Sequence, residues 1–237
     1  MTWSIIAREE ETGRLGLIIA ADALACGPYM CRIATGVGAV ASQGLINPLL
    51  GPQALALLKA GAHPEEAVRL LVTADEGRNL RQLNIMDARG HAAAHTGEAC
   101  IAWCGHEIHG ALSLAGDSLA RPEVLAAAAA AYAEKGGTPL AQRLITAMQT
   151  GEKVGGGNGG NRSAALLIHD QEEYPLLDLR VDDHADPLTE LARLEAVARE
   201  RWIHFRRVLP SEARPYGFTD RARIEEEVAK SIAAGYR

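Results

Sequence analysis

Thr2 is the first residue of the chain whose type and position could make a catalytic group. It begins an apolar, strand-like run, Thr2-Trp3-Ser4-Ile5-Ile6-Ala7-Arg8. If Met1 is removed, Thr2 carries a free α-amine and a hydroxyl, and such an amine has a pKa of about 7.7–8.0 in model peptides. The neutral amine can act as base for the hydroxyl, as in the Thr/N-terminal-amine pairs of covalent catalysis. The alternative interpretation is that the run is only the first strand of a sheet.

A second group of reactive side chains lies in the middle of the chain. Cys100 and Cys104 are separated by three residues, with His95, His106 and His109 nearby. These residues could form a metal site or a Cys/His nucleophile. The alternative interpretation is purely structural: small packed thiols beside histidines at strand ends. The spacing lacks the Cys-x2-Cys pair typical of zinc sites. We therefore expect no metal ion and no cofactor.

Two polar stretches later in the chain also invite a functional reading. The glycine-rich run Gly155–Gly160 lacks the Gly-Lys-Ser/Thr ending and the following helix of a phosphate-binding loop, so we expect a linker, with a lid over a pocket as the alternative. Asp182-Asp183-His184 and Asp186 follow an apolar run. A solvated turn with an Asp helix cap is favoured there over a cation site.

Composition restricts the class of protein. The net charge of −6 argues against nucleic acid or an anionic membrane as the main partner. No apolar run approaches the roughly 20 residues of a membrane span, and no basic leader precedes the first strand. The four cysteines are not spaced like a dense disulfide scaffold. We expect a cytoplasmic protein with reduced thiols.

The predicted elements alternate between groups of strands and pairs of helices. Strands are predicted over residues 2–9, 15–21, 36–42, 81–87, 91–96, 101–103, 108–114, 163–169 and 176–181, with a loop over 23–29. Helices are predicted over residues 52–60, 63–74, 122–135, 138–149, 186–207 and 219–234. This order indicates an α+β protein of stacked layers and not a βαβ parallel sheet. We expect one domain over residues 1–208 and a C-terminal helical extension over 209–237.

Several blocks together resemble the DUF1028 family of bacterial proteins over about residues 2–200. The blocks are Thr2–Arg8, Glu11–Gly16, Gly36–Gln43, Asn47-Pro48, Gly51-Pro52, His95–Gly97, Cys100, Trp103, Gly105-His106, Arg162–Leu167 and Leu179–His184. That family is grouped with the N-terminal-nucleophile (Ntn) hydrolases, so the resemblance implies their four-layer αββα sandwich. The activity of the family itself is poorly defined, so the resemblance implies a chemistry class but no substrate.

The resemblance also implies roles for five residues. Thr2 would be the nucleophile and its released amine the base, and Ser4, on the same strand face, could orient that amine. The turn at Gly44 is where related hydrolases place an oxyanion-hole N–H, a donor commonly worth about 10²–10³-fold in rate. Asn47 is near enough in sequence to assist. Asp117 lies at a turn where relatives gather polar groups around the amine.

The chain departs from the family pattern near this amine. Ala21 and Asp22 stand where members usually carry Ser followed by Lys or Arg, and Gly116-Asp117 replaces Gly-Asn. An added carboxylate would raise the pKa of the amine and make it a poorer base. Two hypotheses follow: a hydrolase that cleaves an amide bond of a small molecule or peptide, or a catalytically inactive αββα protein that binds or assembles with an unknown ligand. Assembly into a homo-oligomer is open under either.

Overall fold

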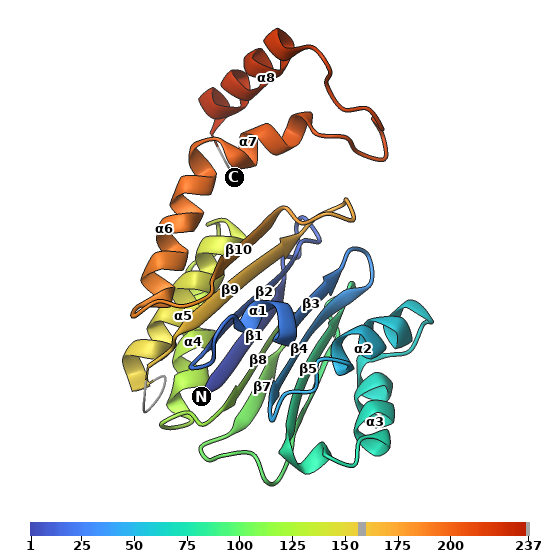
Figure 1. The fold of residues 1–237 in the computed structure, drawn as a ribbon, viewed down its shortest axis with the longest axis vertical. Coiled ribbons are helices and arrows are strands. Elements are labelled where there is room, and N and C mark those ends of the chain that lie inside the picture. Colours follow the sequence, from blue (N-terminus) through green and yellow to red (C-terminus); the bar gives the residue numbers. More distant parts are fainter. Residues whose placement is uncertain (156–159, 236–237) are drawn as a thin grey trace.

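A computed structural model describes residues 1–155 and 160–235, and a six-stranded antiparallel sheet is its largest element (Figure 1). From edge to edge its strands are β10 (Leu177–Val181), β9 (Ser163–His169), β2 (Leu15–Ala21), β1 (Thr2–Arg8), β8 (Leu112–Asp117) and β7 (Gly105–His109). β1 therefore lies inside the sheet, between β2 and β8. Its residues from Thr2 to Ala7 are all buried, which explains the almost unbroken apolar run.

A second, four-stranded antiparallel sheet packs against the first. Its strands are β3 (Cys31–Ala34), β4 (Gly38–Gly44), β5 (Arg81–Asp87) and β6 (Ala92–Thr96). β4 and β5 contact β1, and the small side chains of Ala39 and Ala41 belong to the core cluster between the sheets. A side chain at Gly38 would place its Cβ 2.4 Å from the Met86 carbonyl oxygen. The glycine- and alanine-rich sequence of β4 thus reflects a close approach of neighbouring strands.

Two pairs of helices pack on these sheets (Figure 1). Helices α4 (Glu123–Glu134) and α5 (Leu140–Gly155) contact the six-stranded sheet, and α2 (Leu50–Lys59) and α3 (Pro64–Ala74) contact the four-stranded sheet. Trp3 and Ile5 of β1 pack in the cluster shared with α4 and α5, whereas Ile6 belongs to the cluster between the sheets. Because side chains alternate along a strand, Thr2 and Ser4 lie on the same face as Ile6, toward the four-stranded sheet.

The C-terminal helices begin against β9 and β10 and then lead away from the sheets (Figure 1). They are α6 (Pro187–Glu200), α7 (Trp202–Phe205) and α8 (Arg221–Ala234), with a short 3-10 turn at Arg206–Val208 (η2) after α7. Another 3-10 turn, Arg78–Leu80 (η1), directly precedes β5. The predicted helix cap at Asp186 is confirmed, since its side chain accepts a hydrogen bond from the Thr189 amide at 3.1 Å. His204 of α7 and Ser231 of α8 are buried and 2.9 Å apart through Nδ1 and Oγ. The division at residue 208 stays a prediction.

Some predicted elements are wrong. The strand predicted over 108–114 is two strands, β7 and β8, joined by a turn at Gly110, whose φ is +59°. The strand predicted over 101–103 is a loop that pairs with the chain after β8, and the loop predicted over 23–29 contains helix α1 (Cys26–Met30). The helix predicted over 186–207 is broken at Arg201, whose φ of −147° is not helical. Strand β3 is only four residues long and is not among the predicted strands.

The glycine-rich run Gly155–Gly160 falls mostly outside the described residues, since 156–159 are not among them. Within the described ranges, no helix is both long and apolar enough to cross a membrane.

Candidate functional site

Thr2 and Asp117 face each other at one end of the six-stranded sheet. Thr2 of β1 is directly opposite Asp117 of β8, and opposite Ala21 of β2 on its other side. Directly opposed residues of antiparallel strands point to the same face, with their Cβ atoms about 4.5–5.5 Å apart. Each of the two residues is 8% exposed. The register therefore brings a hydroxyl and a carboxylate together at one end of the strands, where both residues retain slight exposure to solvent.

Met1 continues the strand by one residue and covers the nitrogen of Thr2. Its ammonium group lies 2.7 Å from Asp22 Oδ2, and its carbonyl accepts a hydrogen bond from the Asp22 amide at 3.1 Å. The Met1 side chain is 4% exposed and packs against the core cluster beneath α4 and α5. In this form the Thr2 nitrogen is part of a peptide bond and cannot act as a base.

The Asp117 carboxylate is held by a neighbouring loop. Oδ1 accepts a hydrogen bond from the Ile101 amide at 2.9 Å, and Oδ2 accepts one from Ser118 Oγ at 3.2 Å. Ser118 has a φ of +61°, an uncommon conformation for a residue with a side chain. The loop that carries Ile101 pairs with Ser118 and Leu119 through backbone hydrogen bonds. The carboxylate position is therefore fixed from two sides.

Ser4 and Gln43 are buried beside Thr2 between the two sheets. Gln43 Nε2 donates to the Thr2 carbonyl at 3.3 Å and to the Ala115 carbonyl at 3.0 Å. Ala115 is the residue directly opposite Ser4, so the Gln43 amide lies next to Ser4. Within the described part of the chain, Ser4 Oγ and Gln43 Oε1 are buried without a hydrogen-bond partner. Two unsatisfied polar atoms thus lie next to the end of β1.

A buried polar network that no sequence pattern indicated supports this end of the sheet. Gln82 Nε2 donates to the Gly116 carbonyl at 2.9 Å, and Gln82 Oε1 accepts from Gln43 at 2.6 Å. Deeper in, Ser113 Oγ donates to Asn84 Oδ1 at 2.7 Å. Gln82 and Asn84 alternate with apolar residues, a pattern that usually indicates a solvent-exposed strand face. Here that face packs against a second sheet, so the alternation predicts solvent exposure for side chains that are in fact buried.

The turn at Gly44 lies at the same end of the sheets. Gly44 has a φ of +76°, and an added Cβ would meet the Leu80 carbonyl oxygen at 2.7 Å and Cys100 Sγ at 3.4 Å. Cys100 immediately precedes Ile101, whose amide binds Asp117. The turn that follows Gln43 is therefore packed against the segment that holds the carboxylate.

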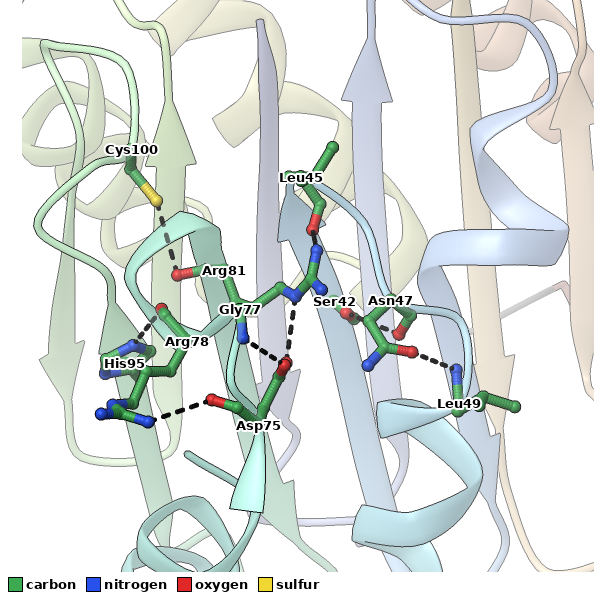
Figure 2. A network of polar contacts seen from close by, with 10 residues as sticks. All are labelled: Ser42, Leu45, Asn47, Leu49, Asp75, Gly77, Arg78, Arg81, His95 and Cys100. Atoms are coloured by element: carbon green, nitrogen blue, oxygen red, sulfur yellow. Dashed lines mark hydrogen bonds and ion pairs between the residues drawn. The ribbon is translucent and has the colours of Figure 1, made fainter. Parts of the chain in front are cut away.

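Asn47 is placed differently from the other predicted site residues. Its side-chain Oδ1 accepts from the Leu49 amide at 3.1 Å, and its carbonyl accepts from Ser42 Oγ at 3.1 Å (Figure 2). Ser42 precedes Gln43 on the strand, so its side chain points to the opposite face, toward α2 and α3. The described contacts of Asn47 are thus at the start of α2, and not on the sheet face that carries Thr2.

An ion pair anchors the same turn from below (Figure 2). Arg81 donates to Asp75 Oδ2 at 3.0 Å and also to the Leu45 carbonyl, while the Gly77 amide donates to Asp75 Oδ1 at 2.8 Å. Burial raises the pKa of Asp75, but the hydrogen bonds from Arg81 and Gly77 outweigh it and hold that pKa below its usual value. The charged pair therefore fixes the backbone that follows Gly44.

The cysteines and histidines considered from sequence are engaged separately. Cys100 Sγ donates to the Arg81 carbonyl at 3.4 Å, and Cys104 Sγ to the Cys100 carbonyl at 3.7 Å. Burial, and then the charge of Asp117, raise the pKa of both thiols, so they are protonated at neutral pH. His95 contacts the Arg78 carbonyl. Within residues 1–155 and 160–235, these side chains do not form a group of three metal ligands.

A cavity of about 1140 Å³ lies at the opposite end of β1, where its lining includes Arg8, Tyr132 and Arg143. Arg8 is six positions after Thr2 along the strand, which corresponds to about 20 Å. This cavity is therefore not the space that adjoins Thr2.

Comparison with known proteins places these features in a family context. A family model described as "Family of unknown function (DUF1028)" matches residues 2–191. The crystal structure of protein SPO2555 from Silicibacter pomeroyi, assigned to the same family model, is 31% identical and superposes with a TM-score of 0.84 over 92% of this chain and 99% of that chain. No curated protein sequence matches the chain significantly.

Two structures of Anbu, the ancestral beta-subunit, are more distant. The protein from Yersinia bercovieri is 12% identical, with a TM-score of 0.41 over 88% of this chain and 98% of that one. The Gly-1 mutant from Hyphomicrobium sp. strain MC1 is 12% identical, with a TM-score of 0.43 over 85% and 96%. Similarity at this level supports no inference about the present chain.

Proposed function

Because the chain belongs to the DUF1028 family, whose function is unknown, its activity must be argued from its own site, and we propose an N-terminal-nucleophile amide hydrolase. The substrate is an amide bond of a small molecule or peptide. The observation that carries the proposal is the placement of Thr2, at the end of an interior strand and opposite the buried carboxylate of Asp117. Removal of one residue, Met1, leaves a hydroxyl, an amine and a carboxylate in one small space.

The fold assignment belongs to the same proposal. The packing of α4 and α5 on one sheet, and of α2 and α3 on the other, supports a four-layer αββα sandwich of the Ntn-hydrolase type. In such an arrangement the first strand is central, and its N-terminal residue lies at an open end of the two sheets. The alternation along β1, which turns Thr2 and Ser4 toward the second sheet, is consistent with that placement.

The chemical steps use atoms of this chain only. Thr2 Oγ attacks the carbonyl carbon of the substrate while its proton passes to the neutral Thr2 amine. The C–N bond then breaks, the ammonium returns that proton to the leaving nitrogen, and an ester with Thr2 remains. Water attacks the ester, the amine again takes the proton, and the carboxylic acid leaves with the Thr2 hydroxyl restored.

Supporting residues have distinct roles in the proposal. Asp117 holds the ammonium form and sets its orientation, and Ser4 supplies a hydroxyl that has no other described partner. The turn at Gly44 provides a backbone N–H for the oxyanion, held in place by Arg81. Asn47 acts only through this turn, because its described contacts lie at the start of α2.

The test is made on untagged protein produced with methionine aminopeptidase available. Its intact mass shows whether Met1 is removed, and an amide library is then screened with the processed form. T2A should abolish hydrolysis, whereas T2S, which keeps a hydroxyl and an amine on residue 2, should retain part of it. A T2A rate equal to wild type, in protein that lacks Met1, would refute the proposal.

One observation favours the second candidate, a catalytically inactive binding or assembly protein. The Met1 amine is paired with Asp22, and the Met1 side chain is almost fully buried, so the uncleaved terminus fits the structure well. Quantitative retention of Met1 would remove the base and support this candidate.

A further inference from the structure

The turn between β5 and β6 carries a cluster of metal-ligand side chains at the far end of the molecule from Thr2. Asp87 ends β5, His91 precedes β6, and His63 is the N-cap residue of α3. One ligand atom from each of the three lies within 4.8 Å of the other two, and of the described residues these alone form such a group. We propose that His63, Asp87 and His91 bind one divalent transition-metal ion of the Zn²⁺ class.

The carboxylate of Asp87 is already oriented for an ion. Its Oδ1 accepts the backbone amides of Arg89 at 2.8 Å and of His91 at 2.9 Å. Oδ2 lies 2.9 Å from His91 Nδ1, which donates its ring proton to the carboxylate. A metal ion entering between them replaces that proton and needs only a small separation of the two side chains.

The turn itself is held by both sheets. The Asp87 amide donates to the His91 carbonyl at 2.9 Å, and the Ala88 amide donates to the Val37 carbonyl at 3.0 Å. Arg8 of β1 donates through Nε to the Ala88 carbonyl at 2.9 Å. Two of the three ligands are therefore carried by a backbone segment that does not have to fold around the ion.

His63 supplies the third ligand from a different element. Its carbonyl accepts the Ala67 amide at 2.9 Å, the first hydrogen bond of α3, so its backbone is fixed. The His63 and His91 rings are 4.9 Å apart between centroids. Glu65 Oε2 lies 3.5 Å from His63 Nδ1, so a carboxylate is within reach of the outer side of this ring.

The remaining movement is small. Ligand atoms of a tetrahedral zinc site, with bonds of about 2.0–2.1 Å, are about 3.4 Å apart. The observed upper limit of 4.8 Å therefore requires a shift of at most about 1.4 Å. The His63 side chain is 49% exposed and can rotate by that amount without disturbing the core.

The ligand set and its surroundings define the type of site. Two imidazoles and one carboxylate favour Zn²⁺ and its neighbours over Mg²⁺ or Ca²⁺. Three protein ligands leave at least one coordination position open. The adjoining cavity of about 360 Å³ is also lined by Lys59 and Arg89, two cations that favour an anion in the open position. The length of β5 puts this site about 20 Å from Thr2, so the ion takes no part in the proposed hydrolysis.

The experiment is a titration of the full-length, reduced protein with Zn²⁺ by calorimetry, and with Co²⁺ by absorption. We expect one ion per chain, with Co²⁺ ligand-field bands and no sulfur-to-cobalt charge-transfer band. H63A, H91A and D87N should each weaken binding by roughly tenfold or more, at least as much as loss of an outer-shell partner does. D87N keeps an oxygen for the two backbone amides, so the turn should stay intact.

H109A is the matched control. His109 is 53% exposed and lies 2.9 Å from Glu107 Oε2, much as His91 is 52% exposed and lies 2.9 Å from Asp87, but it has no third ligand in the described group. Its substitution should leave affinity and stoichiometry unchanged. The proposal is overturned if H109A weakens binding as much as H91A does, if a thiolate band appears, or if folded H63A and H91A variants bind as wild type does. None of these results depends on the state of Met1 or on hydrolase activity.

Discussion

Two serines that are both fully buried on the same face of the six-stranded sheet should respond to the same substitution in opposite ways. Ser4 Oγ is buried without a partner among the residues that the structure describes. Ser113 Oγ donates to Asn84 Oδ1 at 2.7 Å. We expect S4A to raise the free energy of unfolding and S113A to lower it.

The magnitudes follow from what each substitution leaves behind. A buried polar group without a hydrogen bond destabilises the folded protein by about 1–3 kcal/mol. Removing the Ser4 oxygen removes this cost, and the small void that it leaves offsets only a small part of the gain. S4A should therefore stabilise by about 1 kcal/mol, which corresponds to about 2–4 °C in Tm for a chain of this size. S113A removes a hydrogen bond and leaves Asn84 Oδ1 without this donor, so it should destabilise the folded protein by about 1–3 kcal/mol.

Urea unfolding followed by circular dichroism measures both effects. Wild type, S4A and S113A are compared at one pH and one protein concentration, and a common slope m shows that the midpoints report stability alone. The activity assay adds a second readout. The unfolding series uses protein that retains Met1; in processed protein, where Ser4 would orient the free Thr2 amine, S4A should lower the rate.

A fall in the S4A midpoint would refute the reasoning. It would mean that the Ser4 hydroxyl has a partner in the native protein, such as an ordered water that also reaches Gln43 Oε1. Equal destabilisation by S4A and S113A would mean that hydrogen-bond satisfaction does not distinguish these two positions at all.

Three further predictions concern charge and polarity around the same end of the sheets. Q82L should destabilise the folded protein by about 2–4 kcal/mol, because it leaves carbonyl groups such as that of Gly116 unpaired. A change below about 0.5 kcal/mol in urea unfolding would contradict the stabilising role of this network. The pKa of Asp75 is lower in the folded protein than in the unfolded chain. Its ionised carboxylate therefore contributes to the free energy of unfolding above the unfolded pKa of about 3.9, and this contribution is lost as the pH falls through the folded pKa. D75N should therefore be less stable than wild type at pH 7 and closer to it at pH 3, and a gap that does not narrow would contradict this. In processed, active protein, D22N should move the rising limb of the pH–rate profile to lower pH, and an unchanged profile would exclude Asp22 as a group that tunes the amine.

Local patterns were enough to predict much of the fold. Strands with unbroken apolar runs, such as Leu15–Ala21 and Ser163–His169, were predicted to the residue. Helix α3 was predicted closely because Pro64 and the acidic residues after it mark a helix start. Errors came where one residue changes the backbone direction, as Gly110 does between β7 and β8, because a single glycine in an apolar run does not say whether the chain turns.

The candidate site was less predictable, because it depends on register and on the pairing of two sheets. The sequence placed Thr2 and Ser4 on one strand face, but only the antiparallel register brings Asp117 opposite Thr2. The sequence points to Gln43 only through the backbone of the turn that it forms with Gly44, although its side chain reaches the Thr2 carbonyl. The ligand group of His63, Asp87 and His91 was missed because it joins a helix start to a hairpin turn that follows β5, and no local spacing encodes that contact.

The two carboxylates near the N-terminus have opposing consequences for the proposed chemistry. Asp22 lies 2.7 Å from the present terminal amine, and Asp117 is opposite Thr2. Both favour an ammonium over a neutral amine, so they help to hold a processed terminus while they reduce its fraction of active base. A hydrolase built on this site should therefore gain rate as the pH rises through and beyond about 8, the ordinary range of an α-amine. An amide screen confined to neutral pH would then miss a real activity. A processed protein that stays inactive at alkaline pH would have the arrangement of Thr2 and Asp117 but no working base. Binding would then be the function that these residues serve.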